Sequence, residues 1–179
     1  MTSPRIMTSS GEFFYFLEPT NYNYQVEHLA DAASKICRWN GNCKPFYSVL
    51  QHCHLVSLHV PPQHARAAMV HDLIEPLVGD CVSPLKALLP TLKQIEIDAE
   101  REMCKQLGID FPFDKSIKLA DIRSQHTEKR DLFPANTWDM DFENVWPTEY
   151  APFEERISPV SPKEAFILFM ERYEELTKC

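Results

Sequence analysis

Two histidines and two carboxylates in the middle of the chain are the residues best suited to chemistry. They are His52, His71, Asp72 and Asp121. Two imidazoles and two carboxylates make a mixed nitrogen and oxygen ligand set, which suits a first-row divalent cation. Such an ion would lower the pKa of a bound water and neutralise charge that develops on a phosphoryl group. The set therefore predicts a divalent metal site that could activate a water molecule.

The spacing of the two histidines favours a shared ion. We expect one helix over residues 46–60, broken by Pro61 and Pro62, and a second helix over residues 63–77. His52 lies eight residues before the end of the first helix, and His71 lies eight residues after the start of the second. At about 1.5 Å of rise per residue, each lies about 12 Å from the turn. An antiparallel hairpin would bring the two imidazoles level with each other.

The carboxylates near this hairpin divide into ligands and catalytic groups. Asp72 is adjacent to His71, so on a helix the two side chains point in different directions. Both reach one ion only if the ion lies beside the helix, between those two directions. Glu75 shares a helix face with His71 and is our candidate for orienting or deprotonating the attacking water. Asp80, beyond the helix end, is the second candidate for that role. Asp121 lies among apolar neighbours in a later helix, where it is either a ligand or a surface residue.

Positive charge beside the ion would be needed to hold a phosphate. Arg38 and Lys86, with Arg123 as a third candidate, could supply it. Lys129 and Arg130 are expected to be solvated, as most lysines and arginines are. Cys53 follows the first histidine and could add a fifth ligand, but a helix turns its side chain away, which favours buried packing.

An ordered series of motifs carries a resemblance to a known family. The motifs are Ile36–Gly41, Phe46–His52, His71–Asp80, Ser83–Lys86 and Ala120–Arg123. In this order the chain resembles the HD-domain phosphohydrolases, and more narrowly the branch of 5′-deoxynucleotidases and phage dATP triphosphohydrolases. The resemblance runs from about Ile6 to the C-terminus. It implies an all-α HD-domain helical bundle in which residues 1–179 form a single domain.

The resemblance also implies roles for the site residues. It points to a divalent ion (Co²⁺, Mn²⁺, Zn²⁺ or Mg²⁺) and to Glu75 and Asp80 as catalytic groups. Arg38 and Lys86 would hold phosphate oxygens. Trp39 would pack on the sugar or base, although a place in the core is an equal alternative.

The implied substrate is a deoxynucleotide. We expect hydrolysis of dATP to deoxyadenosine and triphosphate, with dADP and dAMP as further substrates and attack on the phosphorus next to the 5′ oxygen. A broad 5′-deoxynucleotidase acting on dNMPs and a non-catalytic nucleotide-binding module remain alternatives. Phage enzymes of this branch do not hydrolyse 2-aminoadenine nucleotides. This selectivity requires a bulky side chain near the 2-position of the purine. Gly41 offers no bulk, so either another side chain supplies it or this protein is less selective.

Composition narrows the class of protein further. A net charge of −8 over 179 residues argues against a surface for nucleic acid polymers. No apolar run is long enough to cross a membrane, and the N-terminus lacks the apolar core of a signal peptide. Six cysteines without Cys-x-x-Cys spacing indicate reduced thiols in a cytoplasm, that of a host cell if the gene is phage-borne. We also expect a homo-oligomer, either a dimer or a hexamer.

The remaining segments predict the frame around the site. Residues 6–19 should form a short extended hairpin, and helices are expected over residues 26–39, 83–106 and 115–131. Ser83 is the expected N-cap of the second of these, and Gly108 its stop. Phe133–Pro162 is too rich in proline and aromatic residues for a plain connection, so we expect a packed loop or contact arm that covers the site or a neighbouring subunit's pocket. The last helix should follow a capping box at Ser161–Glu164.

Overall fold

The computed structural model describes residues 3–134 and 150–178, and these are mostly helical. The predicted all-α class is therefore confirmed. The helices are α1 (Val26–Ala33), α2 (Val49–Leu58), α3 (Ala65–Val70), α4 (Glu75–Val78), α5 (Ser83–Lys86), α6 (Pro90–Leu107), α7 (Lys115–Leu132) and α9 (Pro162–Lys178). Short 3-10 turns occupy Pro19–Asn21, Arg38–Gly41 and Pro62–His64. None of the helices in these described ranges is both long and apolar enough to cross a membrane.

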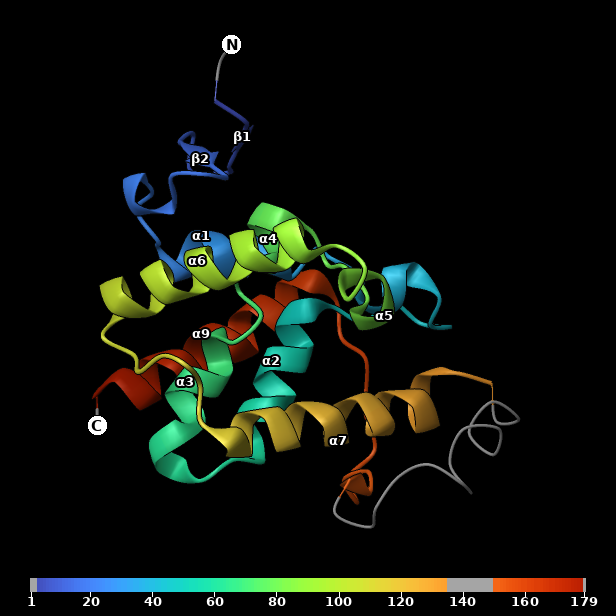
Figure 1. Cartoon of the computed structure of the whole chain (residues 1–179). Coiled ribbons are helices and arrows are strands. Elements are labelled where there is room, and N and C mark those ends of the chain that lie inside the picture. The colour runs from blue at the N-terminus through green and yellow to red at the C-terminus, as the bar shows by residue number, and fades with distance from the viewer. Residues whose placement is uncertain (1–2, 135–149, 179) are drawn as a thin grey trace.

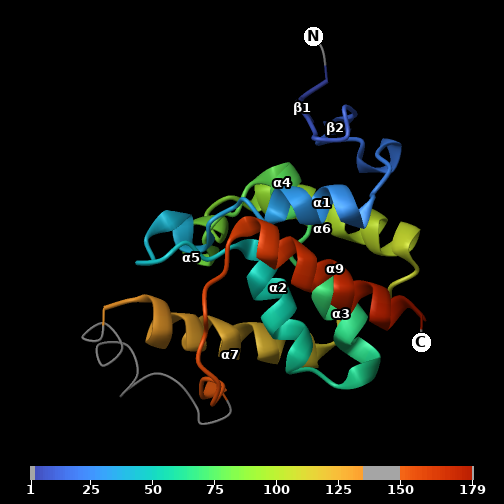
Figure 2. The same cartoon turned by 180° about the vertical axis from the view of Figure 1, so that it is seen from behind.

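Helix α2 lies at the centre of the bundle and contacts α1, α3, α7 and α9. Figures 1 and 2 show α1, α4 and α6 on one side of it and α7 on the opposite side. The main core lies between α1, α2, α6 and α9, where Leu29, Leu50, Met103 and Phe169 are buried. This arrangement leaves one face of α2 beside α7, and the candidate site lies there.

A short antiparallel hairpin precedes the bundle, as predicted. Strands β1 (Arg5–Met7) and β2 (Phe13–Tyr15) pair with Ile6 opposite Phe14. The Phe14 ring is fully buried and packs edge-on against Tyr22, with centroids 5.6 Å apart. This contact ties the hairpin to the body of the molecule, beyond α1 and α6 in Figure 1.

The predicted helix over residues 26–39 is wrong in its second half, because α1 ends at Ala33. The chain then pairs with the residues before α2: Arg38 N–H donates to the Tyr47 carbonyl at 2.8 Å, and Val49 N–H donates to the Ile36 carbonyl at 3.0 Å. These non-local bonds replace the last helical turns. They also place Arg38 and Trp39 in a tight turn beside the start of α2.

The second helix of the histidine hairpin is also discontinuous, contrary to the prediction. Helix α3 ends at Val70, and α4 begins only at Glu75. Between them the backbone bonds shorten to three-residue spacing, as in Glu75 N–H to the Asp72 carbonyl at 3.1 Å. Pro76 contributes to the break because it has no N–H for a regular helical bond. His71 and Asp72 therefore lie on a turn, where neighbouring side chains can converge on one point.

Other boundaries follow local signals only in part. The helix expected over residues 83–106 is divided into α5 and α6 by Pro90, and Val82 rather than Ser83 occupies the N-cap position. Gly108 ends α6 in the left-handed conformation with φ 63°, as predicted. The extent of α7, Lys115–Leu132, agrees with the prediction.

The final helix begins with the predicted capping box. Ser161 N–H donates to Glu164 Oε2 at 2.9 Å, and Glu164 N–H donates to Ser161 Oγ at 3.3 Å. Of the segment Phe133–Pro162, residues 135–149 lie outside the described residues. The described part after them packs on α7, where Phe153 is buried and its N–H donates to Thr127 Oγ1 at 2.9 Å. That part is packed, as predicted for the segment.

Candidate metal centre

Helices α2 and α3 bring the two predicted histidines together. The ring centroids of His52 and His71 lie 5.2 Å apart. Together with Asp72 they offer three ligand atoms within 4.8 Å of one another. Asp72 Oδ2 lies 3.4 Å from Nε2 of each histidine. The three residues could hold a metal ion.

The hydrogen bonds of the two rings turn the same nitrogen of each toward the centre. His71 Nδ1 lies 2.8 Å from the Ala68 carbonyl, and His52 Nδ1 lies 2.7 Å from Glu128 Oε1. Both Nε2 atoms are buried, and neither has a hydrogen-bond partner among the described residues. Burying such atoms is costly unless something binds them. Metal-bound histidines commonly hold the second ring nitrogen on a carboxylate or carbonyl in this way, so the donor set fits a divalent cation.

Asp121 lies at the edge of this group rather than inside it. Its Oδ1 is 3.3 Å from His52 Nε2, but it also accepts a hydrogen bond from Gln125 at 2.8 Å. Lys118 Nζ lies 2.7 Å from the other oxygen, Oδ2. Only 8% of Asp121 is exposed, so the alternative of a surface residue is wrong.

The charges around the centre favour ionised ligands. Burial alone would raise the pKa of Asp121, but the close contact with His52 and the charge of that ring hold it well below its usual range. Burial likewise opposes ionisation of Asp72, yet His71 and then His52 lower its pKa. Burial and Arg38 would lower the pKa of His52, and Glu128 with Asp121 instead raises it to about 9. A cation must therefore displace a proton from His52.

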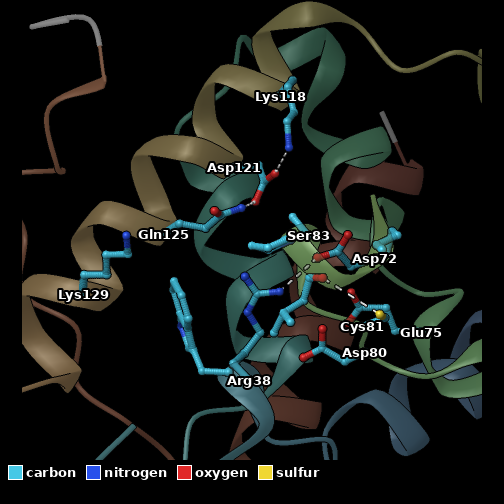
Figure 3. Close-up of a pocket in the computed structure, with 14 residues that line it drawn as sticks. Arg38, Asp72, Glu75, Asp80, Cys81, Ser83, Lys118, Asp121, Gln125 and Lys129 are labelled. Carbon is cyan, nitrogen blue, oxygen red and sulfur yellow. Dashed lines mark hydrogen bonds and ion pairs between the residues drawn. The ribbon is translucent and has the colours of Figure 1, made fainter. Parts of the chain in front are cut away.

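The centre opens into a pocket of about 350 Å³, within the range of small-ligand sites. Figure 3 shows Lys118, Asp121, Gln125 and Lys129 projecting from α7 along one wall. The pocket is lined by Arg38, Trp39, Asp72, Glu75, Asp80, Cys81, Val82, Ser83, Pro84, Lys86, Lys118, Asp121, Gln125 and Lys129.

Both predicted catalytic carboxylates line this pocket. Glu75 Oε2 and Asp80 Oδ2 are buried atoms that lack a hydrogen-bond partner within the described ranges. Burial, followed by the charge of Asp72, raises the pKa of Glu75 well above its usual range. Burial also raises the pKa of Asp80. Carboxyl groups with raised pKa values in a cleft are typical of proton-transfer sites.

The three cationic residues predicted to bind phosphate lie in different places relative to the pocket. Arg38 is buried, and its Nη1 lies 3.4 Å from Asp72 Oδ2. Lys86 lines the pocket with its Nζ 2.8 Å from Glu96 Oε1. Arg123 does not reach the pocket, because its guanidinium lies 4.6 Å from the Phe153 ring centroid and Nε donates to the Ala151 carbonyl. The Arg123 prediction is therefore wrong.

Three further predictions concern packing. Trp39 packs edge-on against Phe133 at 5.2 Å and also lines the pocket, so its packing on a sugar or base stays a prediction. Cys53 is fully buried in the main core, which confirms packing over ligation. The prediction of a solvated Arg130 is wrong, because it makes two hydrogen bonds to the carboxylate of Asp131. Lys129 is half-buried and lines the pocket.

Sequence reasoning missed the contribution of α7 beyond Asp121. Lys118 lies three residues before Asp121, and Gln125 and Lys129 lie four and eight residues after it, so a helical projection centred on Asp121 would have identified all three. Glu128, fully buried beside His52, was missed as well. Its seven-residue separation from Asp121 is again two helical turns.

The fold and site define a helical protein with a candidate metal centre at the floor of a charged pocket. The chain is 34% identical to the uncharacterized protein YfdR of Escherichia coli K12 over 180 residues, covering 97% of this chain and 98% of YfdR. It therefore belongs to the same family as YfdR. An uncharacterized protein of Rhodobacter capsulatus is 27% identical over 138 residues, covering 69% of this chain and 70% of that protein. No protein-family model matches the chain.

Proposed function

We propose that this protein is an HD-domain, metal-dependent phosphohydrolase that acts on deoxynucleotides. The observation that carries the proposal is the pair of buried Nε2 atoms of His52 and His71, which have no hydrogen-bond partner among the described residues and each lie 3.4 Å from Asp72 Oδ2. They lie next to a pocket lined by several cationic side chains and by two carboxylates, Glu75 and Asp80, each with one oxygen that has no hydrogen-bond partner in the described ranges. Ion, water-activating carboxylate and phosphate-binding cations are the parts that metal-assisted phosphate hydrolysis needs.

His52, His71, Asp72 and Asp121 would hold the ion. When bound, a divalent ion in that position would polarise a phosphoryl oxygen and lower the pKa of water. Asp121 would enter the ligand set by giving up part of its contact with Lys118, whose Nζ lies 2.7 Å away. The released ammonium would then be available to a phosphate oxygen in the same pocket.

Glu75 would orient the attacking water and accept its proton. Its raised pKa suits the role, because a base works best when its pKa approaches the working pH. Asp80, on the same side of the pocket, would hold the water in line or return the proton to the leaving oxygen. Arg38 and Lys86 would bind phosphate oxygens, in partial exchange for their present carboxylate partners Asp72 and Glu96.

The substrate we propose is dATP, cut once to deoxyadenosine and triphosphate. The water oxygen bonds to the phosphorus next to the 5′ oxygen, the bond from that phosphorus to the 5′ oxygen breaks, and the nucleoside leaves with a proton. Cationic side chains line both ends of the α7 wall, at Lys118 and Lys129, which suits a polyphosphate longer than one group. Gly41 is not among the residues that line this pocket, so selectivity against a 2-amino purine would have to come from another side chain.

The test is a panel of the four dNTPs and the four dNMPs with Co²⁺, Mn²⁺, Mg²⁺ and Zn²⁺, with nucleoside, phosphate and triphosphate products resolved. We expect dATP turnover to deoxyadenosine and triphosphate. Turnover restricted to dNMPs would instead identify a 5′-deoxynucleotidase. Binding of ion and nucleotide without hydrolysis of any compound would contradict an enzyme and leave a nucleotide-binding module.

A further inference from the structure

Glu128 contacts both halves of the candidate site with one carboxylate. Its Oε1 lies 2.7 Å from His52 Nδ1, and its Oε2 accepts a hydrogen bond from Trp39 Nε1 at 2.8 Å. Arg38 Nη2 lies 3.6 Å from the same Oε2. Glu128 is fully buried, so water does not compete for these contacts. The carboxylate that holds His52, a candidate metal ligand, therefore also contacts Arg38 and Trp39, two of the residues assigned to the substrate.

The segment that carries Arg38 and Trp39 depends on such contacts for its shape. Trp39 and Asn40 have φ angles of 59° and 51°, in the left-handed region that non-glycine residues rarely adopt. A conformation of this kind is unfavourable and persists only where the surroundings hold it. The hydrogen bond from the indole to Glu128 is one of the contacts that holds it.

We propose that Glu128 is a positioning residue that couples occupancy of the metal centre to the placement of Arg38 and Trp39. The inference rests on the proposed function for the identity of the centre. A cation on His52 Nε2 would take the place of the proton there, and the exchange would change the strength of the hydrogen bond between Nδ1 and Oε1. Because the two carboxylate oxygens are rigidly joined, this change reaches the indole through Oε2. By linkage, whatever orders Trp39 raises the affinity for the ion by the same factor.

Glu128→Gln tests the coupling with little change in shape. A glutamine has one acceptor oxygen and one NH₂ donor, so it cannot accept hydrogen bonds from both His52 and Trp39. The probe is Zn²⁺ alone, with its Kd measured by competition against a chromogenic chelator. The second readout is the NMR resonance of the Trp39 indole N–H, identified by its absence in Trp39→Phe. We expect Zn²⁺ to shift this resonance in the parent protein and not in the variant, and the Zn²⁺ Kd to weaken about 10- to 100-fold.

Asp131→Asn is the matched control. Asp131 also lies on α7 with a buried carboxylate, and it accepts hydrogen bonds from Arg130, Arg156 and Ile157. This variant should lose stability but keep the parental Zn²⁺ Kd and indole response. A folded Glu128→Gln protein with both parental values would overturn the proposal.

Trp39→Phe keeps the inference testable if Glu128→Gln fails to fold. It removes the indole donor and leaves every candidate ligand in place. We expect the Zn²⁺ Kd to change by at least about two-fold, as for directly coupled residues. An unchanged Kd would overturn the coupling. The proposed function fails separately. A parent protein that shows the coupling yet hydrolyses no nucleotide keeps the role of Glu128. A parent protein that binds no Zn²⁺ overturns the coupling, while the panel of four ions and eight nucleotides still tests the hydrolysis.

Discussion

His52 and His71 lie with ring centroids 5.2 Å apart, although nineteen residues separate them in the sequence. Each ring is held at Nδ1 by an acceptor of the protein, so both Nε2 atoms are directed toward the candidate metal centre before any ligand binds. A site arranged in advance loses little entropy on binding. The pair is therefore the natural starting point for experiments on the ion.

Asp121→Ala tests the extent of the ligand set. We expect the variant to fold, to bind the ion weakly and to hydrolyse dATP at least about a hundred-fold more slowly, since the ion would supply several kcal/mol of transition-state stabilisation. Metal content after dialysis and steady-state rates measure both effects. Asp114→Ala, at the N-cap of the same helix, controls for changes in α7. Full activity in Asp121→Ala would show that the ligand assignment is wrong.

Glu75→Ala separates catalysis from binding. The ion and the nucleotide should bind as in the parent, while turnover falls by at least about a hundred-fold, the usual contribution of a positioned base. Calorimetric titration and initial rates give the two quantities, with the exposed Glu27→Ala as a control for loss of a surface carboxylate. Equal rates for the variant and the parent would show that Glu75 is not the base and would assign that role to Asp80.

Product analysis decides the position of the cut. With dATP and Co²⁺ we expect deoxyadenosine and inorganic triphosphate to appear together in equal amounts from the first time point. Attack in water enriched in ¹⁸O should label the triphosphate and not the nucleoside, because the phosphorus accepts the water oxygen. Early release of pyrophosphate, or of dADP with phosphate, would rule out the single cut.

Glu100 should make stability depend on pH. Burial, then the charges of Asp72 and Glu96, raises its pKa from 4.5 to about 7. The folded state therefore favours the protonated form, and this contribution is complete below about pH 4.5 and is lost as the pH rises through 7. Glu100→Gln mimics the protonated form and should gain stability relative to the parent across this window, by at most about 3 kcal/mol. Urea unfolding at several pH values with a metal chelator measures the difference, and a constant difference would contradict the raised pKa.

Local signals predicted those elements whose boundaries lie in their own sequence. The capping box at Ser161, the Gly108 stop and the extent of α7 all depend on residues within a few positions of each other. The helix expected over residues 26–39 failed because residues 36–38 bond to residues 47–49 instead, a pairing that no local pattern encodes. The break after Val70 has a local cause in Pro76. The helical periodicity of the surrounding residues nevertheless led to the prediction of one continuous helix over residues 63–77.

The two histidines could be found from residue type and spacing, since a hairpin places residues at equal distances from its turn side by side even though His71 lies on a turn and not in a helix. Glu128 could not, because its role arises from the packing of α7 against α2. A buried glutamate and a solvated one look alike in a helical sequence. Membership of the HD-domain phosphohydrolases stays a prediction, and the product analysis tests it.

The pocket draws its lining from residues 38–39, 72–86 and 118–129, which are far apart along the chain. No fragment that lacks one of these stretches would carry the complete site. Any ligand of the site must therefore oppose global unfolding, by about 2.7 kcal/mol at a hundred times its Kd. Melting temperature can consequently serve as a label-free screen: the metals and nucleotides that raise it are those the assembled site recognises, before any reaction has been identified.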